Sequence, residues 1–155
     1  MNSLLKIQGV SKHFGGFAAL SDVSLEVGQG ERFGLIGPNG SGKTTLINCV
    51  SGSLRNERGS IIFSGEDVTR LPAYQRTRRG IARSFQVPRP FASMSVLENL
   101  LVPLQYAGRG KPDEAFAILK QIGLADKAET QSNQLTQIEL RKLELARAMA
   151  ARPRR

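Results

Sequence analysis

The chain has 155 residues, 40% of them hydrophobic and 23% charged, which is ordinary for one soluble globular domain with an apolar core. No apolar run approaches the roughly 18 residues of a transmembrane helix, and the N-terminus lacks the apolar core of a signal peptide. We therefore expect any contact with a membrane to go through a partner. The single cysteine, Cys49, forms no disulfide within the chain, so we expect a small core residue in a reducing, cytoplasmic compartment.

The net charge of +9 is concentrated in two segments. Residues 70–90 contain no acid and six arginines, namely Arg70, Arg76, Arg78, Arg79, Arg83 and Arg89. Residues 141–155 contain six basic residues against Glu144 alone. Such runs are usually solvated surface, but they also suit nucleic acid, anionic lipid headgroups or an acidic partner loop. Charge alone leaves these alternatives open.

In chain order, the first part of the sequence has the pattern of short strands around one helix. The predicted strands cover residues 4–10, 18–27, 32–36, 60–63 and 80–85. A Gly28-Gln29-Gly30 turn separates the second strand from the third, and an amphipathic helix is predicted over residues 43–50.

Between the third strand and that helix lies Gly37-Pro38-Asn39-Gly40-Ser41-Gly42-Lys43-Thr44, a complete phosphate-binding P-loop. Its glycines let consecutive backbone N–H groups curve around an anion, a path that side chains would obstruct. The following helix directs its N-terminus, worth roughly half a positive charge, at the same anion. The sequence therefore predicts a site for a nucleoside triphosphate.

Each side chain of the P-loop has a predicted role. Lys43 reaches the β- and γ-phosphates, the Thr44 hydroxyl coordinates Mg²⁺, and Thr45 contacts the α-phosphate. The predicted nucleotide-binding residues here are Gly37, Asn39, Gly40, Ser41, Gly42, Lys43, Thr44 and Thr45.

From Pro88 onward the pattern is helical. Ser95 and Glu98 form a predicted capping box, and so do Thr136 and Glu139, which open a final helix ending near Ala151. Between them, a helix is predicted from Pro112, in its first turn, to a terminating Gly123.

Taken together, these segments resemble the ATP-binding subunit of an ABC transporter, and within that family the branched-chain amino acid importers. The likeness runs along the whole chain. Besides the P-loop, it rests on residues 12–16 (KHFGG), 83–86 (RSFQ), 94–99 (MSVLEN) and 141–148 (RKLELARA). It implies an α/β fold with a P-loop NTPase core, an antiparallel β subdomain and an α-helical subdomain, truncated before the Walker B strand. The implied divisions are a core part at residues 1–87, a helical part at 88–151 and a basic end at 152–155.

The resemblance also implies roles for three further residues. Phe14 matches an aromatic that stacks on adenine, although a Phe at a strand end is more often core. Gln86 matches a glutamine that reaches Mg²⁺ or the attacking water, which makes it catalytic together with Lys43. Thr136 matches a hydroxyl presented to the γ-phosphate of the opposite subunit. In that stretch, Ile138 replaces a glycine and Glu139 places a carboxylate near the triphosphate, where like charges repel.

The implied partners are transmembrane permease subunits and a second ATP-binding subunit in a head-to-tail dimer, with no nucleic acid. The implied location is cytoplasmic, peripheral on the inner face of the plasma membrane. The implied function is to couple binding and hydrolysis of Mg·ATP to import of branched-chain amino acids. Two alternatives stay open: an ABC ATPase for another substrate, such as lipid export or urea or amide import, and a soluble nucleotide-dependent nucleic-acid-binding protein, which steeply salt-dependent binding would favour.

We expect little or no ATP turnover by this chain alone. The family's next element would supply an Asp for the Mg²⁺ shell and a Glu that polarises water, followed later by a histidine. Here the sequence stops at Arg155, and its only histidine is His13. Multiple-turnover hydrolysis that Lys43→Ala abolishes would contradict this expectation.

Overall fold

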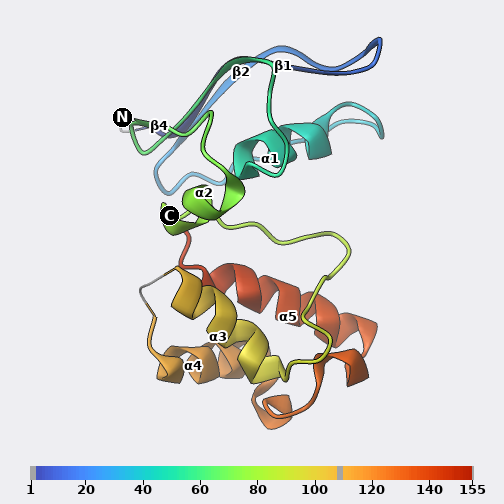
Figure 1. The fold of residues 1–155 in the computed structure, drawn as a ribbon, viewed down its shortest axis with the longest axis vertical. Coiled ribbons are helices and arrows are strands. Elements are labelled where there is room, and N and C mark those ends of the chain that lie inside the picture. Colours follow the sequence, from blue (N-terminus) through green and yellow to red (C-terminus); the bar gives the residue numbers. More distant parts are fainter. Residues whose placement is uncertain (1–2, 108–109, 155) are drawn as a thin grey trace. The chain divides into compact units, whose positions relative to one another are not determined.

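The computed structural model describes residues 3–107 and 110–154 (Figure 1). The chain divides into two compact units, each described by itself. The first, which we call the sheet unit, extends to Arg76, and the second, the helical unit, comprises Thr77–Arg154. No helix within the described residues has the length and apolar character needed to cross a bilayer.

The sheet unit is built on four antiparallel strands in the order β2-β1-β3-β4. These are β1 (Ser3–Phe14), β2 (Phe17–Gly28), β3 (Arg58–Phe63) and β4 (Glu66–Asp67). The hairpin of β1 and β2 closes through Gly15-Gly16, with Phe14 paired to Phe17. The buried side chains of the sheet include Ile7, Val10, Leu20, Ile61 and Phe63. The β1 and β2 strands thus run beyond the predicted ranges, and β4 was not predicted.

Helix α1 (Lys43–Ser51) begins directly after Gly42 and ends at Gly52, and both glycines have left-handed backbone. Its buried side chains are Leu46 and Cys49. The prediction that Cys49 is a core residue is confirmed, and burial raises the pKa of its thiol.

Arg76, in the short helix α2 (Ala73–Arg78), is buried, with only 2% of its surface exposed. Its guanidinium donates to four backbone carbonyls: Cys49 at 2.6 Å, Val50 at 2.9 Å, Leu71 at 2.8 Å and Thr69 at 2.9 Å. Two of these carbonyls belong to the last turn of α1, where a helix has no internal donors left. The prediction that Arg76 belongs to a solvated or partner-binding basic surface is therefore wrong, because its guanidinium is buried and hydrogen-bonded inside the fold.

The helical unit packs α3 (Val96–Tyr106), α4 (Pro112–Ile122) and α5 (Gln137–Ala150), with short 3₁₀ turns η1 (Ala125–Lys127) and η2 (Ser132–Gln134). Figure 1 shows these three helices in yellow to red. Both predicted capping boxes are present, as are the proline in the first turn of α4 and the left-handed Gly123 at its end. The core between the helices includes Leu100, Leu104, Leu119, Leu143 and Ala146.

Two predicted strands are wrong. Residues 32–36 and 80–85 are not strands, because apolar composition makes a strand only where a neighbouring strand supplies hydrogen bonds. Ile36 is 97% exposed. In the other segment, the carbonyl of Gly80 accepts from Arg154, and the N–H of Phe85 donates to a side chain, that of Glu144.

Arg76→Lys is expected to destabilise the sheet unit, because one ammonium cannot reproduce the planar fork that reaches four carbonyls. We expect urea unfolding to show a loss of about 1–3 kcal/mol in the free energy of unfolding. The matched control is Arg70→Lys at an exposed position, for which we expect no measurable change. Equal unfolding midpoints for the two variants would refute the structural role of Arg76.

Candidate phosphate-binding site

The P-loop is anchored to the sheet by a contact between backbones. Gly42 has φ +85°, and a Cβ there would lie 2.4 Å from the carbonyl oxygen of Ala19 in β2. The same atom would lie 3.0 Å from Cδ2 of Leu20. Real Cβ atoms do not approach a carbonyl oxygen so closely, so only glycine fits. Strand β2 therefore sets where the loop ends and where α1 begins.

Lys43 is held by the loop that precedes it. Its Nζ donates to the carbonyl of Gly37 at 2.6 Å, to the carbonyl of Pro38 at 2.5 Å and to Oγ of Ser41 at 3.0 Å. Three donors are all that an ammonium has, so each is satisfied. The charge of Lys43 thus lies inside the curve of residues 37–41, which is where the P-loop pattern requires it.

The remaining P-loop residues lie just before α1 and in its first turn. Thr44 is exposed and Thr45 is half-buried in the first turn, while Asn39 and Gly40 are exposed. Gly40 is also left-handed, with φ +83°, but a Cβ there would meet nothing within 4 Å. The two left-handed glycines thus have different roles. Gly40 gives the loop its backbone shape, whereas Gly42 also lets the loop backbone pack against β2.

Phe14 lies at the end of β1, and 52% of its surface is exposed, so it is not the core residue that strand position alone favours. Lys12 Nζ lies 5.5 Å from the centroid of the Phe14 ring and 3.0 Å from Oε1 of Glu57. His13 Nδ1 lies 2.8 Å from Oε2 of Glu57. Hydrogen bonds from His13 and Lys12 lower the pKa of Glu57 to about 2. Glu57, the shared partner of Lys12 and His13, was not singled out in the sequence, because it meets them only once the end of β1 lies beside the start of β3.

The other two predicted site residues belong to the helical unit. Gln86 is exposed within the irregular segment 81–91. Thr136 is the exposed N-cap of α5, and its Oγ1 accepts the N–H of Glu139 at 3.4 Å.

The carboxylate of Glu139 is occupied within the helical unit. Its Oε1 lies 2.5 Å from Nζ of Lys127, and its Oε2 accepts from the N–H and the hydroxyl of Thr136, each at 2.9 Å. These bonds lower the pKa of Glu139 to about 2. Since Lys127 balances its charge, Glu139 repels an anion less than an isolated carboxylate would.

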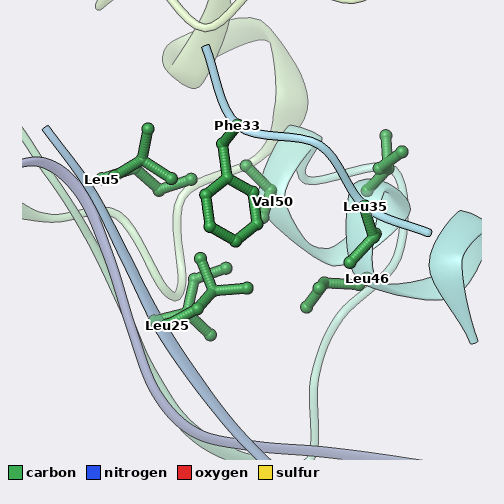
Figure 2. A pocket seen from close by; sticks show the side chains of 9 residues that line it. Leu5, Leu25, Phe33, Leu35, Leu46 and Val50 are labelled. Carbon is green, nitrogen blue, oxygen red and sulfur yellow. The ribbon is translucent and has the colours of Figure 1, made fainter. Parts of the chain in front are cut away.

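An apolar pocket of about 250 Å³ also lies in the sheet unit. It is lined by Leu5, Ile7, Leu25, Val27, Phe33, Leu35, Leu46, Ile47 and Val50. Figure 2 shows the ring of Phe33 reaching in among Leu5, Leu25 and Val50. Its lining offers no hydrogen-bonding side chain, so this pocket contributes no phosphate or metal ligand and belongs to the packing between the sheet and α1.

Among residues 3–107 and 110–154, no three His, Cys, Asp or Glu side chains gather where they could hold a metal ion. The donor set of the P-loop nevertheless fits a magnesium nucleotide. It combines an ammonium, a helix N-terminus and the hydroxyl of Thr44 around a backbone path that tolerates no Cβ at Gly42.

Gly42→Ala and Gly40→Ala form a matched pair for this site. Both place a Cβ on a left-handed residue, which costs about 1–2 kcal/mol, but only Gly42→Ala also collides with the Ala19 carbonyl. We expect Gly42→Ala to abolish measurable ATP binding and to lower the thermal unfolding temperature further than Gly40→Ala does. Equal losses in the two variants would show that the contact with β2 does not shape the loop.

Comparison with known proteins places this geometry in a family. The model of the ABC transporter family matches residues 20–154. The probable branched-chain amino acid transport ATP-binding protein LivG of Archaeoglobus fulgidus is 41% identical over 94% of this chain and 63% of its own length. The high-affinity LivG protein of Escherichia coli is 36% identical over 97% of this chain and 66% of its own length. The chain thus spans just under two thirds of these relatives.

Solved structures agree. A nucleotide-free ATP-binding cassette from an ABC transporter superposes with a TM-score of 0.83 at 34% identity, covering 97% of this chain and 66% of that one. A dimeric cassette in a post-hydrolysis state, bound to ADP and Pi, gives 0.86 at 27% identity, covering 96% and 70%. The expected α/β cassette fold is therefore confirmed, as is the likeness to branched-chain amino acid transport ATPases. The chain belongs to the ABC transporter family.

Proposed function

We propose that this chain is part of the ATP-binding subunit of an ABC transporter that imports branched-chain amino acids, and that its P-loop binds Mg·ATP. The observation that carries the proposal is the approach of Gly42 to the Ala19 carbonyl, which fixes a loop shaped for an anion at the start of α1. The names of the relatives, branched-chain amino acid transport ATP-binding proteins, support the substrate class.

In this proposal the triphosphate takes over bonds that the loop now makes to itself. Lys43 exchanges the carbonyls of Gly37 and Pro38 for phosphate oxygens, which are stronger acceptors because they are charged. Backbone N–H groups of residues 40–45 and the N-terminus of α1 add neutral donors. Thr44 and Gln86 are the proposed Mg²⁺ ligands, and the metal would otherwise be held through the nucleotide. When bound, the metal would supply positive charge that offsets the negative charge of the phosphates.

Phe14 is the proposed platform for adenine. Its ring is more than half exposed, with Lys12 held beside it by Glu57. An aromatic ring has two faces, so one face can be near the ammonium while the other stacks on a base. Thr136 is the proposed hydroxyl for the γ-phosphate of a second copy in a head-to-tail dimer.

Transmembrane permease subunits are the proposed partners, and through them this chain would lie on the inner face of the plasma membrane. Segment 81–91 offers a surface for them, since Phe85, Val87 and Phe91 are exposed. The guanidinium of Arg83 lies 4.7 Å from the centroid of Phe85, and that of Arg147 lies 5.0 Å from the centroid of Phe91.

The division into a core part at residues 1–87 and a helical part at 88–151 also remains our proposal.

Titration calorimetry with Mg·ATP tests the nucleotide site. We expect saturable binding to one site, and an affinity about 10–100-fold lower for Lys43→Ala, which removes one charge-assisted contact. Phe14→Ala should weaken ATP about 2–10-fold and leave inorganic tripolyphosphate unaffected, because tripolyphosphate has no base to stack.

Lys142→Ala is the control for charge, since it removes one exposed cation from α5. It should bind Mg·ATP as the unaltered chain does. Absence of binding by folded protein, or equal affinities for the Lys43 and Lys142 variants, would overturn the proposed site.

A further inference from the structure

Glu144, in the middle of α5, is a buried carboxylate with 4% of its surface exposed. Its Oε1 accepts the N–H of Phe85 at 3.2 Å. Its Oε2 accepts the N–H of Arg89 at 3.4 Å and a guanidinium N–H of Arg147 at 3.1 Å. A buried carboxylate is tolerated only with such donors, and here two of the three come from the backbone of segment 81–91.

Arg147, three residues further along α5, closes the arrangement. Its Nη1 donates to the carbonyl of Arg89 at 2.7 Å as well as to Glu144, and its guanidinium lies over the ring of Phe91. Glu144 and Arg147 therefore bind both the N–H and the C=O of Arg89.

The downstream end of the segment is fixed by a second buried side chain. Asn99 of α3 is fully buried, and it accepts the N–H of Phe91 at 2.8 Å and donates to the Phe91 carbonyl at 3.1 Å. The hydroxyl of Ser132 donates to the same carbonyl at 2.8 Å. The segment is thus attached at residues 85, 89 and 91, while the side chains of Gln86 and Val87 between the attachments are exposed.

We propose that Glu144 is the positioning residue for Gln86, joining the segment that carries Gln86 to the helix that carries Thr136 at its N-terminus. Glu144 lies eight positions after Thr136, which is about 12 Å along α5. A displacement of Gln86 then either carries α5 with it or breaks the bonds from the Phe85 and Arg89 amides to Glu144. We call the bonds from the Phe85 and Arg89 amides to Glu144 the joint. The roles of Gln86 and Thr136 rest on the proposed function, but the joint does not.

Two substitutions at Glu144 weaken the joint to different extents. Glu144→Leu removes every acceptor, whereas Glu144→Gln keeps one carbonyl oxygen of similar reach and loses the charge that attracts Arg147. In native-state hydrogen exchange we expect the Phe85 and Arg89 amides to exchange about tenfold faster or more in Glu144→Leu, and by a smaller factor in Glu144→Gln. Amides in α3 and α4 should keep their protection.

The controls are Glu129→Gln and Glu129→Leu, which make the same chemical changes at an exposed carboxylate of the helical unit. Both should leave the Phe85 and Arg89 amides unchanged. Unchanged exchange at these amides in Glu144→Leu would overturn the proposal. So would faster exchange spread evenly over α3, α4 and segment 81–91, because Glu144 would then support the whole bundle and not one segment.

A second measurement does not depend on amide exchange. The chain has no tryptophan, so Val87→Trp at an exposed position provides a single fluorescent reporter next to Gln86. We expect faster anisotropy decay when Glu144→Leu is added to this background, and no change when Glu129→Leu is added. Equal decays in all three proteins would contradict the joint. Neither measurement uses nucleotide, so a failure of the proposed ATP site would leave both results interpretable.

Discussion

The approach of the Gly42 backbone to the Ala19 carbonyl is the constraint on which the candidate site depends. It joins β2 to the residue that immediately precedes α1, so the strand determines where the helix starts and where its free N–H groups point. Lys43 then follows at a position from which its ammonium reaches back to Gly37 and Pro38. An anion site made this way uses backbone geometry more than side-chain chemistry, and a single methyl group at residue 42 would disturb it.

Buried polar side chains organise the segments that lack regular structure. Arg76 gathers four carbonyls around the end of α1, Asn99 pairs with both backbone groups of Phe91, and Glu144 accepts the amides of Phe85 and Arg89. In each case one side chain supplies the hydrogen bonds that a helix or a sheet ladder would otherwise supply. Such side chains are costly to bury unless every bond forms, so they favour one arrangement of the loop over others.

Local patterns were enough to predict the features that depend on neighbouring residues. The two capping boxes, Pro112 at the start of α4, Gly123 at its end and the helix after the P-loop were predicted because each needs only a few consecutive residues. The strands predicted at 32–36 and 80–85 were wrong because pairing depends on residues far along the chain. The burial of Arg76 and Glu144 was missed for the same reason, although Glu144 is the only acid in the basic segment 141–155, a signal that it has a cationic partner.

The central claim is that the P-loop of this chain holds a nucleoside triphosphate. It is tested most directly by following backbone amide signals in NMR spectra as Mg·ATP is added. The account predicts large shifts for residues 37–45, smaller ones for Phe14 and its neighbours in the β1–β2 hairpin, and saturation of all of them with one dissociation constant. Saturable shifts confined to the helical unit, or shifts at the arginine-rich segments that grow without saturating, would contradict it.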